Sequence, residues 1–148
     1  MELLYDKLIV ATGSKVRNGE VIQAPVHYLR TLQDSLSLRP LLREGAGVAI
    51  VGGSFIGLEI AAVARSPNRN VTVREAQANL LAQSSSRALS DWMCRLHVAQ
   101  NVKVPSNTKA NRITRASSGR PTSDTSAGTV IADVVVVGIG VMPNDELA

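Results

Sequence analysis

Cysteine is nearly absent from this chain, and long apolar runs are missing altogether. Cys94 is the only cysteine among 148 residues. No disulfide can form within the chain, and a reducing compartment, the cytoplasm, is expected. No apolar run is long enough to cross a membrane. The acidic Glu2 and Asp6 near the start, with no long apolar core behind them, do not resemble a signal peptide. The sequence therefore indicates neither a membrane protein nor a disulfide-linked secreted domain.

Aromatic residues make up only 3% of the chain, and its positive charge is scattered. The net charge is +4, but the 16 Lys and Arg residues form no basic run, and aromatic residues are not interleaved with them. We therefore expect no nucleic-acid partner. His27 and His97 stand far apart, with no Ser/His/Asp set and no cluster of metal ligands around them. No catalytic acid, base or nucleophile and no metal site is predicted.

What is present is a globular composition, 45% apolar and 19% charged, of a length that suits one domain. Buried strands alternate with helical patterns, an order typical of a mostly parallel sheet. The expected strands are 8–11, 48–51, 71–73 and 131–137, with weaker strands at 102–104 and 111–114 forming an antiparallel edge. The Ser/Thr/Gly-rich stretch 116–128 is expected to be a surface loop.

Three helices are expected between these strands. The first begins at the N-cap Thr31, with Asp34 completing a near capping box, and Pro40 should shorten or kink it before residue 43. The second follows residue 54 and ends at Pro67. The third follows three serines and carries an apolar stripe at helical spacing that is expected to be core. This stripe consists of Leu89, Trp92, Met93 and Leu96.

The most informative segment is Val48–Glu59, where a buried strand runs into a glycine turn that opens an apolar helix. Gly52 allows a sharp turn off the strand, and Gly57 allows the helix to lie close to the sheet. The free N–H groups at the start of the helix would point at a pyrophosphate. Twenty-three residues after Gly52, Glu75 ends the next strand and could accept hydrogen bonds from ribose hydroxyls. This pattern predicts a dinucleotide-binding unit that prefers NAD(H), because Glu75 would repel a 2′-phosphate.

Two residues depart from this pattern. Ser54 stands where the middle glycine of G-x-G-x-x-G is expected, although its small side chain could cap the helix or bind a phosphate oxygen. Arg74, beside Glu75, is a cation that could tolerate a 2′-phosphate. The predicted fold class is nevertheless α/β: a Rossmann-like three-layer domain with a central parallel sheet and a small antiparallel β element.

Three segments, Tyr5–Ser14, Val51–Glu59 and Asp133–Asn144, together resemble the FAD-dependent pyridine nucleotide-disulphide oxidoreductases, in particular their ferredoxin and rubredoxin reductase branch. Tyr28–Asp34 also fits that branch. The resemblance covers nearly the whole chain but only part of such a reductase. It implies that residues 1–14 are a remnant of an FAD-domain strand and linker. Residues 15–148, with a core at about 30–140, would then be the NAD(H)-binding domain.

The resemblance also implies a function. The parent enzyme would pass hydride from NADH to FAD and electrons on to an iron–sulfur protein of ferredoxin or rubredoxin type. The FAD and interface domains would be missing partners, and this chain alone should bind nucleotide but neither bind FAD nor turn over. Thr12 and Gly13 would lie beside the FAD. The residues expected at the NAD(H) site are Gly52, Gly53, Ser54, Phe55, Ile56, Gly57, Glu59, Glu75, Gly138, Ile139 and Gly140.

The roles of several residues remain open at this point. Phe55 could cover the nicotinamide pocket or be a core residue, and Glu59 could contact the nicotinamide end or be a surface carboxylate. Asn79 and Gln83 stand where family members often carry phosphate-binding arginines. These departures suit an alternative function, a standalone nucleotide-sensing or scaffold module with a decayed site. A flavoenzyme assembled from separate chains is a third possibility.

Overall fold

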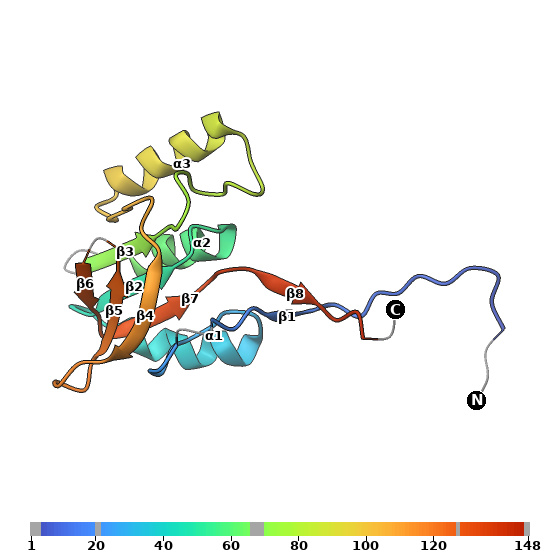
Figure 1. The fold of residues 1–148 in the computed structure, drawn as a ribbon, viewed down its shortest axis with the longest axis horizontal. Helices are drawn as coiled ribbons and strands as arrows, with labels where there is room; N and C mark the ends of the chain where they lie inside the picture. Colours follow the sequence, from blue (N-terminus) through green and yellow to red (C-terminus); the bar gives the residue numbers. More distant parts are fainter. Residues whose placement is uncertain (1–3, 20–21, 66–69, 127, 147–148) are drawn as a thin grey trace.

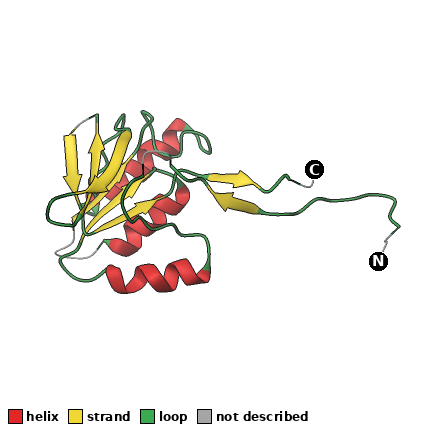
Figure 2. Cartoon of the chain, turned by 60° about the horizontal axis from the view of Figure 1, so that its bottom comes forward, coloured by secondary structure: helices red, strands yellow, loops and turns green. Residues whose placement is uncertain are grey.

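The computed structural model describes residues 4–19, 22–65, 70–126 and 128–146, and its body has three layers (Figure 2). A parallel sheet lies in the middle, with helices on one face and an antiparallel sheet on the other. The expected fold class, a Rossmann-like α/β domain with a small antiparallel element, is confirmed.

The central sheet contains three parallel strands, which have buried apolar side chains on both faces. In spatial order they are β3 (Asn70–Arg74), β2 (Gly47–Val51) and β7 (Val134–Val137). Single parallel bridges extend it at both edges, from Lys103 to Thr72 and from His27 to Val136. Segment 102–104 is thus parallel to β3, and the expectation of an antiparallel strand there was wrong. Strands covered on both faces need apolar residues at successive positions, which is why β2 and β7 are nearly continuous apolar runs.

The helices pack on the face of the sheet that carries Ile50, Val73 and Val136. They are α1 (Leu32–Leu38), α2 (Phe55–Ala64) and α3 (Arg87–Ala99), with a short 3-10 helix at Arg39–Leu41 after α1. The capping box of α1 is confirmed, because Thr31 and Asp34 exchange hydrogen bonds of 3.2 and 2.8 Å. The α-helix gives way to the 3-10 turn where Pro40 lies, as expected. Pro67 lies outside the described residues, and α2 ends before it.

The antiparallel sheet packs on the opposite face of the parallel sheet. Its strands are β4 (Ala110–Arg115), β5 (Pro121–Thr125) and β6 (Gly128–Ile131). The antiparallel pairing of 111–114 is confirmed, but 116–128 is not a surface loop. Its second half is β5, where Thr122 and Ser123 are buried. A cross-strand hydroxyl contact from Thr114 Oγ1 to Thr122 Oγ1, at 2.9 Å, satisfies the side chain of Thr122.

The expected strand 131–137 is in fact the junction of two strands. β6 ends at Ile131 and β7 begins at Val134, so the chain passes from the antiparallel to the parallel sheet between them. Asp133 fixes this junction: its Oδ2 accepts from the N–H of Gly47 at 2.8 Å, and its Oδ1 lies 3.0 Å from Nε of Arg120. The junction therefore also holds the start of β2.

The apolar stripe of α3 does not face the core as expected. Leu89, Trp92 and Leu96 are 41%, 50% and 43% exposed. Only Met93 of the stripe packs against the core, where Cys94 joins it. The face that the helix turns inward also carries two buried polar residues, Ser90 and His97. The helical spacing was correct, but the buried face of the helix is rotated from the expected stripe by about one residue.

A two-stranded antiparallel ribbon, β1 (Ser14–Val16) with β8 (Val141–Pro143), projects from the body of the molecule (Figure 1). The N-terminal segment continues outward beyond it. The buried strand expected at 8–11 is not formed: these residues are extended and exposed, Ile9 by 88%. Within the described residues this segment pairs with no neighbouring strand, so its apolar side chains have no surface to cover them.

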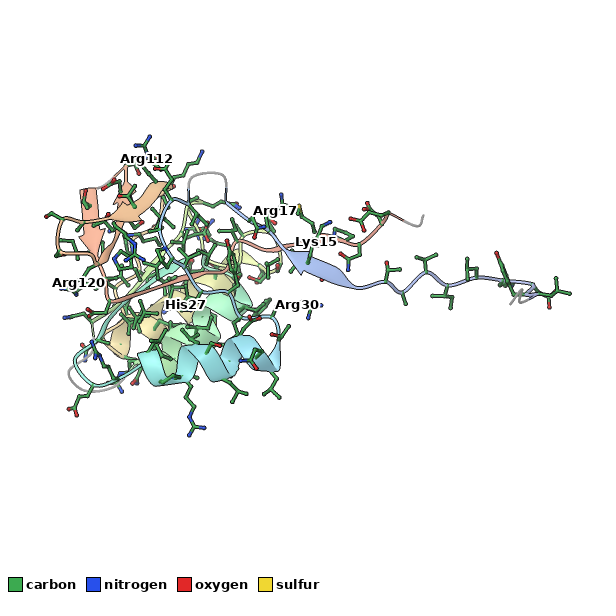
Figure 3. The ribbon with its side chains drawn as sticks, turned by 90° about the horizontal axis from the view of Figure 1, so that it is seen from below. Lys15, Arg17, His27, Arg30, Arg112 and Arg120 are labelled. Atoms are coloured by element: carbon green, nitrogen blue, oxygen red, sulfur yellow. The ribbon has the colours of Figure 1, made fainter. Side chains whose placement is uncertain are left out.

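The positive charge is scattered in space as it is in sequence. Figure 3 shows Lys15 on β1, Arg17 directly after it, Arg30 before α1, and Arg112 and Arg120 on the antiparallel sheet and its turn. Neither a helix long and apolar enough to span a membrane nor a group of three metal-ligating side chains occurs in the described part of the chain.

Candidate dinucleotide site

The turn after β2 passes so close to the end of β7 that only glycine fits at its first position. Gly52 has a φ of +109°, and a Cβ on it would lie 2.4 Å from the carbonyl oxygen of Gly138. Its N–H donates to the carbonyl of Arg74 at 2.9 Å, which ties the turn to β3 as well. The sharp turn predicted at Gly52 is therefore required by both neighbouring strands.

Gly57 brings helix α2 onto this turn. A Cβ on Gly57 would lie 2.2 Å from the carbonyl oxygen of Gly52 and 3.3 Å from Cγ2 of Ile50. No side chain larger than hydrogen is compatible with this approach. The close packing of helix against strand predicted at Gly57 is thus observed, and it directs the first turn of α2 at the carboxyl end of the sheet.

Ser54, the departure from the glycine pattern, has two structural contacts. Its Oγ accepts from the N–H of Gly57 at 3.3 Å, so it is the N-cap of α2. The same hydroxyl donates to the carbonyl of Gly138 at 2.9 Å. Ser54 thereby joins the start of α2 to the end of β7 and leaves the N–H groups of Phe55 and Ile56 as the free donors of the helix N-terminus.

Glu75 lies directly across from the glycine turn. Its Oε2 accepts from the N–H of Gly53 at 2.7 Å, and its Oε1 accepts from the N–H of Gln77 at 2.7 Å. A Cβ on Gly53 would lie 2.9 Å from Glu75 Oε2 and 2.5 Å from Cδ2 of Leu80, so a side chain there would displace these two side chains. The carboxylate is therefore held in one orientation by two backbone donors, with further lone pairs left to accept from a ligand.

A cavity of about 310 Å³ opens between these groups at the carboxyl ends of β2, β3 and β7. Seven of the predicted site residues line it: Gly52, Gly53, Ser54, Glu75, Gly138, Ile139 and Gly140. Segments distant in sequence are thus brought together around one opening. This is the position at which open parallel α/β sheets bind ligands.

Four predicted site residues do not line the cavity. Gly57 lies beneath it, packed on Gly52. Phe55, Ile56 and Glu59 are exposed on the outer side of the first turns of α2. Phe55 is 49% exposed, so its alternative role as a core residue is wrong. Phe55 and Glu59 lie four residues apart, on the same face of the helix.

The loop after β3 supplies lining residues that sequence reasoning missed. Segment 76–77 and residues 81–84 border the cavity, as do Thr108 and Ala110. The N–H of Leu81 donates to the carbonyl of Gly53 at 3.0 Å, which draws this loop over the glycine turn. Of the two places where arginines were expected, Gln83 lines the cavity and Asn79 does not. The small side chain and the amide at 76–77, directly after Glu75, are the sequence feature that could have indicated this part of the lining.

Arg74 does not extend freely into this cavity. It is 5% exposed, and its Nη1 donates to Oγ1 of Thr125 on β5 at 2.8 Å. Side chains alternate along a strand, so Arg74 and Glu75 leave β3 on opposite faces. Arg74 is nevertheless among the residues that border the cavity.

Thr12 and Gly13 lie outside the cavity, at the projecting ribbon. The hydroxyl of Thr12 donates to the carbonyl of Asn144, and Nδ2 of Asn144 donates to the carbonyl of Thr12 at 3.0 Å. The N–H of Asn144 donates to the carbonyl of Gly13 at 3.0 Å. The two flanks of the domain are therefore held side by side where they leave its body.

These features fit a dinucleotide. The groove has a backbone floor that a Cβ would fill, two free N–H donors at the start of a ten-residue helix, and an oriented carboxylate at the far wall. The helix end suits a pyrophosphate, and the carboxylate suits vicinal hydroxyls. A groove of this composition suits the binding and orientation of a ligand.

Comparison with known proteins agrees with this architecture. The family model described as pyridine nucleotide-disulphide oxidoreductase matches residues 1–148. The ferredoxin–NAD(+) reductase component of an anthranilate 1,2-dioxygenase system from Burkholderia cepacia is 46% identical, and the match covers 99% of this chain and 37% of that protein. A rubredoxin–NAD(+) reductase from Pseudomonas putida is 36% identical, with 99% and 39% covered. The chain spans little more than a third of the length of these relatives.

Solved structures show the same fold. A ferredoxin reductase from Rhodopseudomonas palustris superposes with a TM-score of 0.84 at 34% identity, covering 93% of this chain and 35% of that one. Putidaredoxin reductase, in its covalent complex with putidaredoxin, gives a TM-score of 0.84 at 29% identity, with 97% and 36% covered. The chain belongs to the pyridine nucleotide-disulphide oxidoreductase family, in its ferredoxin and rubredoxin reductase branch.

Proposed function

We propose that residues 15–148 form the NAD(H)-binding domain of a flavin-dependent ferredoxin or rubredoxin reductase. The observation that carries this proposal is one groove at which Gly52 forms the turn, Gly57 packs beneath it and Glu75 lies opposite. The pyrophosphate would lie over the turn at Gly52 and the free N–H groups of α2, while Glu75 would accept from the adenine ribose. A 2′-phosphate beside that carboxylate would be repelled, so NADH should bind more tightly than NADPH.

The nicotinamide end would lie toward Gly138–Gly140, on the side where Phe55 and Glu59 are exposed. In the whole reductase, NADH would supply the hydride and FAD would accept it before single electrons pass to the iron–sulfur protein. The part of this chain is to bind and orient the nucleotide. That division of work needs no catalytic acid or base in this domain.

The projecting ribbon supports the proposed division of the parent protein. β1 and β8 leave the body side by side, as two connections to one neighbouring domain must (Figure 1). Residues 1–14 would then belong to the FAD domain, where Thr12 and Gly13 would lie beside the flavin. The exposed apolar side chains of Leu8, Ile9 and Val10 would be covered there.

Isothermal titration calorimetry of this chain with NADH, then NADPH, tests the proposal. We expect saturable binding of NADH that is at least about tenfold tighter than that of NADPH, a difference of about 1.4 kcal/mol. Absorbance near 450 nm after incubation with FAD and gel filtration is the companion measurement, and no flavin should be retained. Absence of NADH binding by the folded chain would favour the alternative, a scaffold module with a decayed site.

A further inference from the structure

A second cavity, of about 650 Å³, opens at the β3 edge of the parallel sheet. Its polar wall consists of Asn70, Thr72 and Arg74 on β3 and of Lys103 on the segment beside it. Its apolar wall comes from residues 104–105 and from the end of β6. The lining contains two cations and no carboxylate. The cavity is thus a positively charged cleft between the two sheets.

Arg74 lines this cleft, and one of its hydrogen-bond donors has no partner. Its guanidinium is buried and donates through Nη1 to Thr125, but its Nε has no hydrogen-bond partner. None of the ion pairs in the described part of the chain includes Arg74. Desolvation lowers the pKa of Arg74 from its usual value, as expected for a buried cation without an anion. A buried charge of this kind is costly unless an anion or water pairs with it.

The geometry of the strands brings further groups to the same side. Thr72 and Arg74 are two residues apart on β3, so they share a face. Lys103 is bridged in parallel to Thr72, with hydrogen bonds from Lys103 N–H to the Val71 carbonyl at 2.9 Å and from Val73 N–H to the Lys103 carbonyl at 2.8 Å. Bridged partners place their side chains on one face of a sheet, so Lys103 lies beside Thr72 on the face that also carries Arg74.

A second unpartnered buried atom lies between the two sheets. Ser123 is completely buried, and its Oγ also lacks a partner. Ser123 and Thr125 alternate with Asp124 along β5 and therefore face the parallel sheet together. Ser123 does not line the cleft, so of the two unpartnered buried atoms of the described residues only Nε of Arg74 belongs to a lining residue.

We propose that this cleft binds a phosphate group, with Arg74 and Lys103 as its cationic partners and the hydroxyl of Thr72 as a further donor. A guanidinium with a free N–H, a flexible ammonium and a hydroxyl form a donor set suited to a tetrahedral dianion. The site is separate from the dinucleotide groove, whose anion partners are backbone N–H groups of α2. The two cavities share only Arg74, so the proposal holds whether or not the chain binds NADH.

Titration of ¹⁵N-labelled chain with sodium phosphate, at constant ionic strength set with chloride, tests this site. We expect saturable shifts of the amide signals of 70–74 and 103–104. Lys103→Gln should weaken phosphate binding about tenfold, because a hydrogen bond to a charged group is lost. Lys7→Gln removes the same charge from the exposed N-terminal segment and should bind phosphate like the wild type.

A second titration distinguishes the source of the phosphate. If ribose 5-phosphate binds more tightly than inorganic phosphate, the site takes an organic phosphate whose carbon part contacts the apolar wall. If it binds equally or more weakly, the site takes the free phosphate ion. Shifts confined to 52–57, no saturation, or equal affinity of Lys103→Gln and Lys7→Gln would overturn the proposal. Arg74→Gln should abolish binding, and if it fails to fold, the exposed Lys103 variant decides alone.

Discussion

The backbone N–H of Gly53 donates a 2.7 Å hydrogen bond to Oε2 of Glu75, which joins the turn after β2 to the loop after β3. The other carboxylate oxygen accepts from Gln77, so both are oriented before any ligand arrives. An acceptor fixed in this way loses little conformational entropy on binding. The same bond means that Glu75 would shape the floor of the groove as well as contact the ribose.

Replacement of Glu75 should therefore change both affinity and preference. We expect Glu75→Ala to weaken NADH binding about tenfold and to narrow the gap to NADPH, because an acceptor and a repelling charge are both lost. Glu75→Gln retains an acceptor oxygen without the charge, so it should lose less NADH affinity while gaining NADPH affinity. Calorimetric titration measures both ratios. An unchanged NADH-to-NADPH ratio would show that Glu75 does not contact the ribose.

Gly57→Val should abolish nucleotide binding. The added Cβ would overlap the carbonyl of Gly52, so α2 must move away from the turn, and its free N–H groups would no longer point at the pyrophosphate. Val63→Ala is the matched control, since Val63 is 72% exposed on the same helix. Circular dichroism reports folding beside the NADH titration. A folded Gly57→Val chain with wild-type affinity would contradict the assigned groove.

Ser54→Ala should lower the free energy of unfolding by about 1–2 kcal/mol, because it removes the N-cap of α2 and leaves the carbonyl of Gly138 without the hydroxyl donor. Urea unfolding followed by circular dichroism measures this loss. Ser118→Ala, at an exposed turn position, should change the midpoint little. Equal stabilities of the two variants would show that Ser54 is not needed to join α2 to β7.

The candidate site was largely predictable because its main requirements are local. One segment of 24 residues contains all three: a turn that needs glycine, a helix that must approach a strand, and an acid at the end of the next strand. The sequence does not show which of these groups form hydrogen bonds with one another. The bond from Ser54 to Gly138 links residues 84 positions apart, and no local pattern records it.

The errors in the fold share a physical cause. The polar Ser and Thr side chains of β5 predict a loop, yet Thr122 and Ser123 are buried, Thr122 with a cross-strand hydroxyl contact to Thr114 and Ser123 without a hydrogen-bond partner for its Oγ. In α3 the helical period was correct, but apolar residues occupy two adjacent faces. Only the partner surface decides that Ser90 and His97 turn inward while Trp92 stays half exposed. Tertiary packing overrides composition in both cases.

Burial of His97 should make stability depend on pH. The imidazole is 6% exposed in the last turn of α3, and desolvation lowers its pKa below the usual 6.5. As pH falls below 6.5 the unfolded chain takes up this proton before the folded chain does. The free energy of unfolding should therefore decrease, until the pH reaches the lowered pKa of the folded state.

His97→Leu removes this proton, so its stability should vary less than that of the wild type between pH 7.5 and 5.5. Urea midpoints measured at intervals across this range report the difference. The pKa of Asp34 is also lowered, by its hydrogen bonds from Thr31. Its carboxylate loses its stabilising effect only as the pH falls below the usual pKa of 3.8, which is outside this range. Parallel curves for His97→Leu and wild type would mean that protonation of His97 is not opposed by its burial in α3.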